Sequence, residues 1–205
     1  MIMTMSKTEE SAKKSAPYTK VDTLGKRFKK SAEEHGYTGF LGHLKYSVKY
    51  LKNFYFNLFA MFVPYSGLRV TLHRVRGVKI GKNVLIGFNV TIDNIYPHLV
   101  TIEDGVSLAG NNLILTHSKP LEYHKDVLDS YVAPVVIKKN VWVTVGVTVL
   151  AGVTIGEGSV IAANSLVTKD IPPHCLAAGN PAKGTPAVHR SQGAPAQDAG
   201  DAVQV

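Results

Sequence analysis

Aliphatic residues recur at every sixth position along the middle of this chain. With two interruptions, the series runs through Ile80, Ile86, Ile92, Ile102, Leu108, Ile114, Ile137, Val143, Val149, Ile155, Ile161 and Val167. Four positions after most of them stand β-branched, small or amide residues, namely Val84, Val90, Val106, Asn112, Val141, Val147, Val153, Ser159 and Ser165. The position directly after the aliphatic residue is often small or turn-prone, as at Gly81, Gly87 and Asp93. The chain therefore repeats as a hexad with restricted residues at positions i and i+4.

A six-residue period predicts an all-β solenoid, a parallel β-helix. Helical solenoids have repeats of about 33 to 47 residues, which this period excludes. In a β-helix one hexad supplies a short strand and a corner, and three hexads close a triangular coil that pairs with its neighbours. We expect the i side chains to fill the axis and a turn-tolerant residue to stand at i+1. Two insertions interrupt the repeat, one around residues 96–98 and one over residues 118–136.

The segment before the repeat shows helical spacing. Its apolar positions step by four and three residues through Leu44, Val48, Leu51, Tyr55, Leu58 and Phe62. A neighbouring stripe is cationic and consists of Lys45, Lys49 and Lys52. The spacing predicts a helix within residues 40–63, ended by Pro64, whose apolar face packs on the following domain. The alternative is an interfacial helix that contacts anionic lipid.

Composition suits one domain with appendages. The chain has 205 residues, of which 45% are apolar and 19% charged. Such a chain can bury a core and is not disordered throughout. We expect a disordered or loosely helical lead-in over residues 1–36, a helical segment over 37–77, the β-helix over 78–183 and a disordered tail over 184–205.

The net charge of +8 is unevenly distributed. Residues 1–79 hold 15 Lys and Arg against 5 Asp and Glu, whereas residues 80–205 hold 8 against 10. The second half is therefore not a nucleic-acid binder. The single cysteine, Cys175, excludes an intrachain disulfide. The first residues carry no apolar signal core, and the longest uncharged apolar stretch, residues 54–63, is too short to span a membrane. We expect a cytoplasmic protein, with membrane association through residues 40–63 as the alternative.

His117 is the main candidate for chemistry. It stands at the root of the second insertion, at position i+3 of the hexad that starts at Ile114, so its ring is free to face outwards. An imidazole with a pKa near 6.5 suits a general base at neutral pH. The structural alternative is a histidine that stabilises the loop root through hydrogen bonds. We interpret the other histidines as solvated or locally bonded, and the pair His174-Cys175 is not a nucleophilic site because adjacent extended residues point apart.

Three segments resemble a known family. They are Lys138-Lys-Asn-Val-Trp-Val, the run from Val149-Leu-Ala-Gly-Val-Thr to Lys169-Asp-Ile-Pro-Pro, and Ala178-Gly-Asn-Pro-Ala-Lys183. They are similar to the hexapeptide-repeat transferase superfamily, in its acetyl-CoA-dependent acetyltransferase branch, over residues 69–183. The stretch from Val63 to Val84 is similar to the subgroup of cell-surface polysaccharide (colanic acid, lipopolysaccharide or capsule) O-acetyltransferases.

The resemblance implies a left-handed parallel β-helix that assembles as a homotrimer, with active sites at subunit interfaces. His117 lines up with the family's catalytic histidine, and no metal is expected. Residues implied in acceptor binding are Asn89, Asp93, Asn94, His98 and His124. The acceptor-binding asparagine of galactoside and maltose acetyltransferases aligns with Gly87, so Asp93 is the substitute; its alternative roles are to orient the histidine or to make a turn.

The cosubstrate implied by the resemblance is acetyl-CoA. The residues implied in holding it are Trp142, Ala162, Ala163, Thr168, Lys169 and Lys183. Thr144 and Val145 stand where relatives carry Gly-Ala or Gly-Ser, a departure at the position implied to contact the thiol end of CoA. The implied reaction is O-acetylation of a sugar hydroxyl by direct attack.

Three other functions fit parts of the pattern. An N-acetyltransferase of an amino sugar or other small amine would use the same base. A zinc hydratase like the γ-type carbonic anhydrases would need His98, His117 and His124, whose spacing does not resemble that family. An inactive scaffold would bind no acetyl-CoA.

Overall fold

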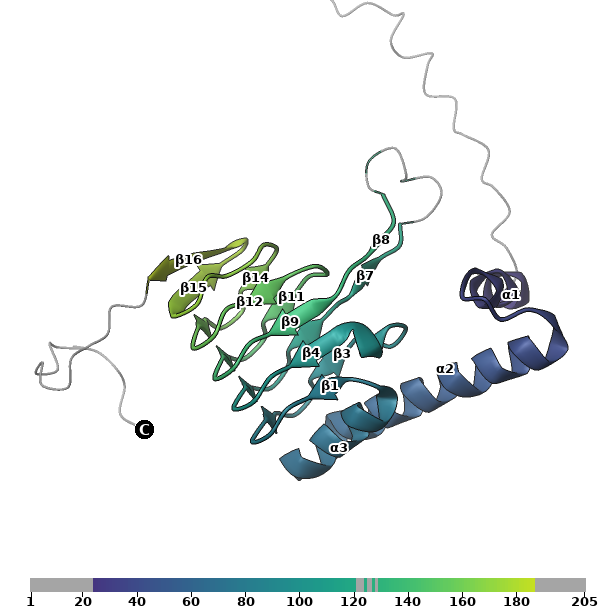
Figure 1. The fold of residues 1–205 in the computed structure, drawn as a ribbon, viewed down its shortest axis with the longest axis horizontal. Helices are drawn as coiled ribbons and strands as arrows, with labels where there is room; N and C mark the ends of the chain where they lie inside the picture. Colours follow the sequence, from purple (N-terminus) through teal and green to yellow (C-terminus); the bar gives the residue numbers. More distant parts are fainter. Residues whose placement is uncertain (1–23, 121–123, 125–126, 128, 187–205) are drawn as a thin grey trace, which may run out of the picture. The chain divides into compact units, whose positions relative to one another are not determined.

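The computed structural model describes residues 24–120, 124, 127 and 129–186 (Figure 1). Most of the predicted lead-in, residues 1–23, and most of the predicted tail, residues 187–205, lie outside the described residues. The chain divides into two compact units, residues 1–49 and 50–205.

The second unit consists mainly of three parallel sheets. Sheet A contains β1 (Lys79–Ile80), β4 (Val100–Ile102), β9 (Val135–Ile137) and β12 (Thr154–Ile155). Sheet B contains β2 (Leu85–Ile86), β5 (Ser107–Leu108), β10 (Trp142–Val143), β13 (Val160–Ile161), β15 (Cys175–Gly179) and the antiparallel β16 (Ala182–Pro186). Sheet C contains β3 (Thr91–Ile92), β6 (Leu113–Ile114), β11 (Thr148–Val149) and β14 (Leu166–Val167).

Consecutive strands of the repeat enter sheets A, B and C in turn, which is the arrangement of a three-sided parallel β-helix (Figure 1). The first insertion holds the short 3-10 helix η1 (Pro97–Leu99). The second begins as the antiparallel pair β7 (His117–Ser118) and β8 (Tyr131–Val132), and it ends before β9 begins at Val135. The left-handed sense of the winding stays a prediction.

The predicted axial column is present. Eleven of the twelve aliphatic i residues are buried, and Ile80, in the first strand, is half-buried. All nine i+4 residues are buried as well. The polar ones satisfy backbone groups of the corners: Asn112 accepts from the Val147 amide at 2.8 Å, and the Ser159 hydroxyl donates to the Pro172 carbonyl at 2.8 Å. The core is thus apolar along its axis and hydrogen-bonded at its edges.

The corners correct one expectation. The residue with left-handed backbone stands at i+3, not at i+1. The i+3 residues with positive φ are Asn83, Asn89, Gly105, Asn111, Asn140, Gly146, Gly152, Gly158 and Asn164. Asparagine and glycine are the residues that adopt this conformation at least cost. Glycine at i+1 has another reason, because a Cβ on Gly156 would lie 2.3 Å from the Pro173 nitrogen of the next coil.

Helix α3 (Ser66–Arg76) caps the first coil. Inside the stack, the carbonyl of each i residue accepts an amide from the preceding coil, as Ile102 does from Gly81 at 2.8 Å. Strands β1, β2 and β3 are the edges of their sheets, so their own i carbonyls need another donor. Three arginines of α3 supply it: Arg74 Nη2 to Ile80 at 3.1 Å, Arg69 Nε to Ile86 at 2.6 Å and Arg76 Nη2 to Ile92 at 2.7 Å. One arginine therefore closes the edge of each sheet.

In the first unit, helix α1 (Leu24–Glu34) packs on the beginning of α2 (Gly39–Phe62). Tyr46 is buried there, with its ring centroid 5.2 Å from that of Phe28 and 5.5 Å from that of Tyr37. The Tyr46 hydroxyl is 2.9 Å from the Ser31 hydroxyl. A cluster of aromatic rings therefore holds these two helices together.

Helix α2 presents a different face from the predicted one. All six residues of its apolar stripe are exposed. In the second unit the buried side of α2 instead carries Asn53, Asn57 and Ala60. For the four stripe residues within the second unit, Leu51, Tyr55, Leu58 and Phe62, the expectation that they pack on the β-helix is therefore wrong. The two asparagines instead make polar contacts: Asn57 Oδ1 accepts from Arg76 Nη1 of α3 at 2.8 Å, and the Asn53 side-chain amide donates to the Asn94 carbonyl at 3.3 Å. Over the described ranges, no helix has the length and apolarity to cross a membrane.

Candidate active site

Asp93 and His117 meet where the chain passes from sheet C to sheet A. Asp93 follows β3 directly, and His117 opens the insertion that leaves the next coil after β6. Because β3 and β6 pair in parallel register, with Ile92 opposite Ile114, the chain directly after β6 lies next to Asp93 on the adjacent coil, and His117 is reached three residues after Ile114. Coil stacking therefore brings the carboxylate to the imidazole.

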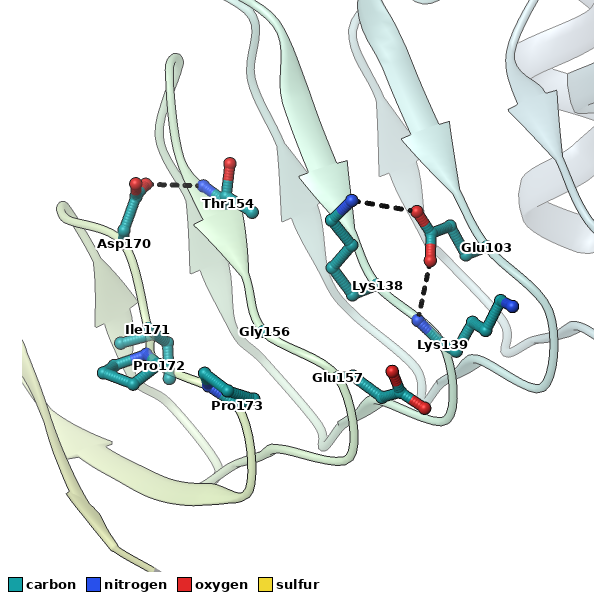
Figure 2. Close-up of a pocket in the computed structure, with 10 residues that line it drawn as sticks. All are labelled: Glu103, Lys138, Lys139, Thr154, Gly156, Glu157, Asp170, Ile171, Pro172 and Pro173. Atoms are coloured by element: carbon teal, nitrogen blue, oxygen red, sulfur yellow. Dashed lines mark hydrogen bonds and ion pairs between the residues drawn. The ribbon is translucent and has the colours of Figure 1, made fainter.

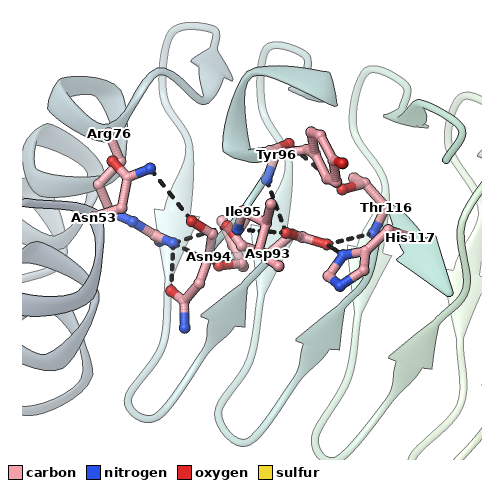
Figure 3. A network of polar contacts seen from close by, with 9 residues as sticks. Asn53, Arg76, Asp93, Asn94, Ile95, Tyr96, Thr116 and His117 are labelled. Carbon is pink, nitrogen blue, oxygen red and sulfur yellow. Dashed lines mark hydrogen bonds and ion pairs between the residues drawn. The ribbon is translucent and has the colours of Figure 1, made fainter. Parts of the chain in front are cut away.

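The carboxylate of Asp93 has a complete set of donors (Figure 3). Its Oδ1 accepts the amides of Ile95 at 2.8 Å and Tyr96 at 2.9 Å. Its Oδ2 accepts the Thr116 amide at 2.9 Å and lies 2.6 Å from His117 Nδ1. A carboxylate in this setting only accepts, so Nδ1 carries the proton and donates it. The other ring nitrogen, Nε2, is then the basic one in the neutral ring.

Electrostatics keep this carboxylate charged. Burial by itself raises the pKa of Asp93, because it disfavours the ionised form. The hydrogen bonds from the amides of Tyr96 and Thr116 and from His117 outweigh burial and hold the Asp93 pKa below its ordinary value. The Asp93 side chain has no exposed surface, whereas that of His117 is 23% exposed. The result is a buried anion behind an accessible imidazole, which suits proton abstraction by Nε2.

Asp93 was predicted to contact the acceptor, and the structure gives it another contact. Its oxygens are buried and occupied by protein donors, so the alternative role, orienting His117, fits the geometry. Asn94 is next to it and is held by Arg76, whose Nη2 donates to Asn94 Oδ1 at 2.8 Å. Asn89 lies at a different corner, between sheets B and C, where its amide donates to Asn111 at 2.9 Å. The structure therefore does not bring Asn89 to His117.

An aromatic residue that sequence reasoning missed lies beside His117. The Tyr96 ring centroid is 5.6 Å from that of His117 and 6.2 Å from that of His98, edge-on in both cases. The interruption of the hexad series after Ile92 was the signal that could have found Tyr96, because it predicts that residues 93–99 project from the coil. His98 and His124 are exposed. Among the residues that the structure describes, no three His, Cys, Asp or Glu side chains form a metal-binding group.

The residues predicted to bind acetyl-CoA lie in three places. Trp142 is 52% exposed on the outer face of sheet B, and Lys183 is exposed in β16 of the same sheet. Ala162 and Ala163 follow β13 at the corner between sheets B and C. Thr168 and Lys169 follow β14 at the corner between sheets C and A, the same edge that carries His117 on an earlier coil. The described chain alone therefore does not gather them into one cleft.

An open hollow lies elsewhere on the described part of the chain (Figure 2). It follows the outer side of sheet A and is lined by Glu103, Lys138, Lys139, Thr154, Gly156, Glu157, Asp170, Ile171, Pro172 and Pro173. Lys138 Nζ pairs with Glu103 Oε1 at 3.1 Å across its wall. Asp93 and His117 are not among its lining residues, so this hollow is separate from the histidine site.

Comparison with known proteins shows which proteins share this repeat. A family model for the bacterial transferase hexapeptide (six repeats) matches residues 134–169. The galactoside O-acetyltransferase of Escherichia coli strain K12 is 41% identical over 107 residues, which cover 52% of this chain and 52% of that protein. The chain spans about half the length of the curated relatives it matches.

Two solved structures extend the match. A galactoside acetyltransferase in complex with coenzyme A is 30% identical, with a TM-score of 0.54 over 68% of this chain and 80% of that one. A hexapeptide-repeat acetyltransferase of Vibrio cholerae in complex with acetyl-CoA is 26% identical, with a TM-score of 0.56 over 67% and 86%.

Stacked hexads around an aliphatic axis define the class of hexapeptide-repeat proteins. With the matches above, the chain belongs to the hexapeptide-repeat transferase family.

Proposed function

We propose that this protein is an acetyl-CoA-dependent O-acetyltransferase that acts on a sugar hydroxyl, with His117 as general base. The observation that carries the proposal is the 2.6 Å contact between Asp93 Oδ2 and His117 Nδ1, which leaves Nε2 as the proton acceptor. The names of two solved relatives, one bound to coenzyme A and one to acetyl-CoA, support the donor. The galactoside O-acetyltransferase relative supports a sugar acceptor.

The reaction is a direct transfer. His117 Nε2 takes the proton of the acceptor hydroxyl while its oxygen attacks the thioester carbonyl. The tetrahedral intermediate collapses, the carbon–sulfur bond breaks, and the imidazolium gives its proton to the leaving CoA sulfur. The products are an acetyl ester and CoA with a free thiol. Asp93 holds the ring and stabilises its positive charge during the step.

The cosubstrate would lie along the later coils. Small residues at Ala162 and Ala163 let the pantetheine arm approach the backbone, and Lys169 and Lys183 offer positive charge to its phosphates. Thr168 would bond a phosphate oxygen. Because these residues are spread over one protomer, we propose that a homotrimer with left-handed β-helices completes each site, and that exposed Trp142 is covered by a neighbouring protomer or by CoA.

The acceptor would contact the residues around the first insertion. Asn94, His98 and His124 are the candidates in this protomer, and Tyr96 adds an aromatic edge beside His117. We propose a cell-surface glycan or its precursor as acceptor, in line with the resemblance of residues 63–84. Asn89 remains a candidate only if a neighbouring protomer brings its corner to the site.

Helix α2 suggests how the enzyme would reach such an acceptor. Within the second unit, Leu51, Tyr55, Leu58, Phe59 and Phe62 are all exposed and form what we call the α2 stripe. Residues 35–92 contain no Asp or Glu, and six of their eight Lys and Arg are exposed, whereas Arg69 and Arg76 are buried. Exposed apolar side chains within a purely basic segment match the chemistry of an anionic lipid surface. We propose that the α2 stripe docks on such a membrane.

The test of the function is release of free thiol from acetyl-CoA with a panel of sugars and amino sugars. The wild-type protein should show acceptor-dependent release, and His117→Ala should lose at least about 100-fold in rate while it still binds acetyl-CoA. His43→Ala, in the first unit, is the control. Equal rates in wild type and His117→Ala would end the general-base proposal. A preference for amino sugars would favour N-acetylation.

A further inference from the structure

We propose that Arg76 is a positioning residue for the transfer, and that it fixes the backbone of Asp93 so that the carboxylate holds His117. This inference rests on the proposed function. It adds to the site a residue that lies outside the repeat and 41 positions before His117 in the chain. Arg76 does not touch a reacting atom, so its effect passes through Asp93.

The guanidinium of Arg76 clasps the chain on both sides of the carboxylate (Figure 3). Its Nη2 lies 2.7 Å from the Ile92 carbonyl, 2.8 Å from the Asp93 carbonyl and 2.8 Å from Asn94 Oδ1. These acceptors belong to three consecutive residues. The peptide planes before and after Asp93 are therefore both held, and they set the direction in which its side chain leaves the backbone.

The clasp is itself anchored from two helices. Arg76 Nη1 donates to Asn57 Oδ1 of α2 at 2.8 Å and to His73 Nδ1 of α3 at 2.8 Å. Burial, and then the charge of Arg76, lower the pKa of His73 to about 3, so this ring is neutral and accepts. Asn53 of α2 adds a bond to the Asn94 carbonyl at 3.3 Å. The polar face of α2 thus reaches the catalytic corner through Arg76.

The other two capping arginines show what is particular to Arg76. Arg69 and Arg74 also close carbonyls of the first coil, at Ile86 and Ile80, but their acceptors lie at the ends of sheets B and A. Only Arg76, among the three, bonds the carbonyl of Asp93. All three should contribute to stability, whereas Arg76 alone should contribute to the geometry of the Asp93–His117 pair. This difference makes Arg69 and Arg74 matched controls.

The experiment compares Arg76→Lys with Arg69→Lys and Arg74→Lys in the full chain. A lysine keeps the charge but cannot bridge three acceptors and two anchors at once. We expect Arg76→Lys to lower kcat by about 10- to 100-fold, as a displacement near 1 Å would, with the KM for acetyl-CoA within about twofold. The two controls should lower the Tm but keep kcat within about twofold. Equal loss of kcat in all three variants would overturn the proposal.

Two further measurements separate positioning from folding. In the His117→Ala background Arg76→Lys should have no further effect on residual activity, because there is no ring left to orient; an undiminished loss would overturn the proposal. Asn57→Leu removes one anchor of Arg76 and replaces Arg76→Lys in this test if that variant does not fold. We expect Asn57→Leu to lower kcat as well. An unchanged kcat would contradict the proposed role of Arg76.

A measurement that does not depend on acetyl transfer tests this inference separately from the proposed function. The 15N chemical shifts of His117, assigned by difference from His117→Ala, report which ring nitrogen carries the proton. Wild type should show the Nδ1–H form, and Arg76→Lys should show a mixture of tautomers. If wild type transfers no acetyl group but the tautomer still depends on Arg76, the proposed function fails and the clasp stands. If the tautomer is unchanged in Arg76→Lys, the clasp fails.

Discussion

Replacing Asp93 by asparagine tests the site most directly. The amide has one oxygen where the carboxylate has two, so it cannot accept all four hydrogen bonds. If its oxygen keeps the amides of Ile95 and Tyr96, its NH2 group faces the Thr116 amide and His117 Nδ1. Donor then meets donor at Thr116, and His117 Nδ1 becomes an acceptor. The proton moves to Nε2, which is the nitrogen that must be basic.

The magnitude follows from two contributions. Loss of a charge-assisted hydrogen bond costs about 1.5–3 kcal/mol, which is roughly 10- to 100-fold in rate. The wrong tautomer adds to this, and in Ser-His-Asp triads an asparagine in the place of the aspartate lowers kcat by about 10⁴. We therefore expect Asp93→Asn to lower kcat by about 10²- to 10⁴-fold. An unpaired buried amide at Thr116 should also cost about 1–3 kcal/mol of unfolding free energy.

The assay is thiol release at saturating acetyl-CoA, with acetyl-CoA binding measured by calorimetry. Asp104→Asn is the matched control, because Asp104 Oδ1 also accepts a backbone amide, that of Lys82 at 2.7 Å, but at an exposed corner away from His117. The control should keep its rate. A kcat for Asp93→Asn within about threefold of wild type would refute the orienting role of Asp93.

Three other predictions concern the rest of the molecule. The single tryptophan, Trp142, is 52% exposed, so its fluorescence should shift to the blue or be quenched when acetyl-CoA is titrated in, and an unchanged spectrum would remove it from the CoA site. Because burial holds His73 neutral with a pKa of about 3, while an unfolded imidazole titrates near 6.5, the unfolded state binds the extra proton between these values. Unfolding free energy should therefore fall by up to about 1.4 kcal/mol per pH unit below pH 6.5. Urea titrations at several pH values should show that the unfolding free energy of His73→Gln falls less steeply with decreasing pH. Full-length protein should co-sediment with phosphatidylglycerol vesicles but not with phosphatidylcholine alone, and Leu58→Glu with Phe62→Glu should abolish this; a change in oligomeric mass without a change in lipid binding would instead identify a second copy as the partner of the α2 stripe.

The axial column was predictable because it depends only on the residue pattern within each hexad. A hexad fixes which side chains point inward, and stacking identical hexads leaves no other place for Ile137, Val143 or Ile155 than the axis. The corners were predicted less well. The i+3 asparagines and glycines were visible, but only the positive φ at positions such as Asn140 and Gly146 shows that they make the turn.

His117 could be proposed from the sequence because it stands off the core at a loop root, and the resemblance strengthened it. Its partner could be named only as one of several residues near the first insertion. Asp93 lies 24 positions away, and its distance to His117 depends on which strands pair across the intervening coil. Neither Tyr96 nor Arg76 could be singled out from the sequence, because an aromatic residue in a loop and an arginine in a basic segment are both common.

The sequence by itself determined the period, the column of aliphatic side chains and the accessible histidine, because each depends on neighbours within a few hexads. The tertiary structure alone decided which face of α2 is buried and what holds Asp93. An amphipathic spacing defines a stripe but not its surroundings. At the first coil the carbonyls of Ile80, Ile86 and Ile92 have no preceding coil to bond, and they accept hydrogen bonds from arginines instead. The arginines of α3 and the asparagines of α2 therefore make polar contacts there, and the α2 stripe, within the same unit, stays exposed.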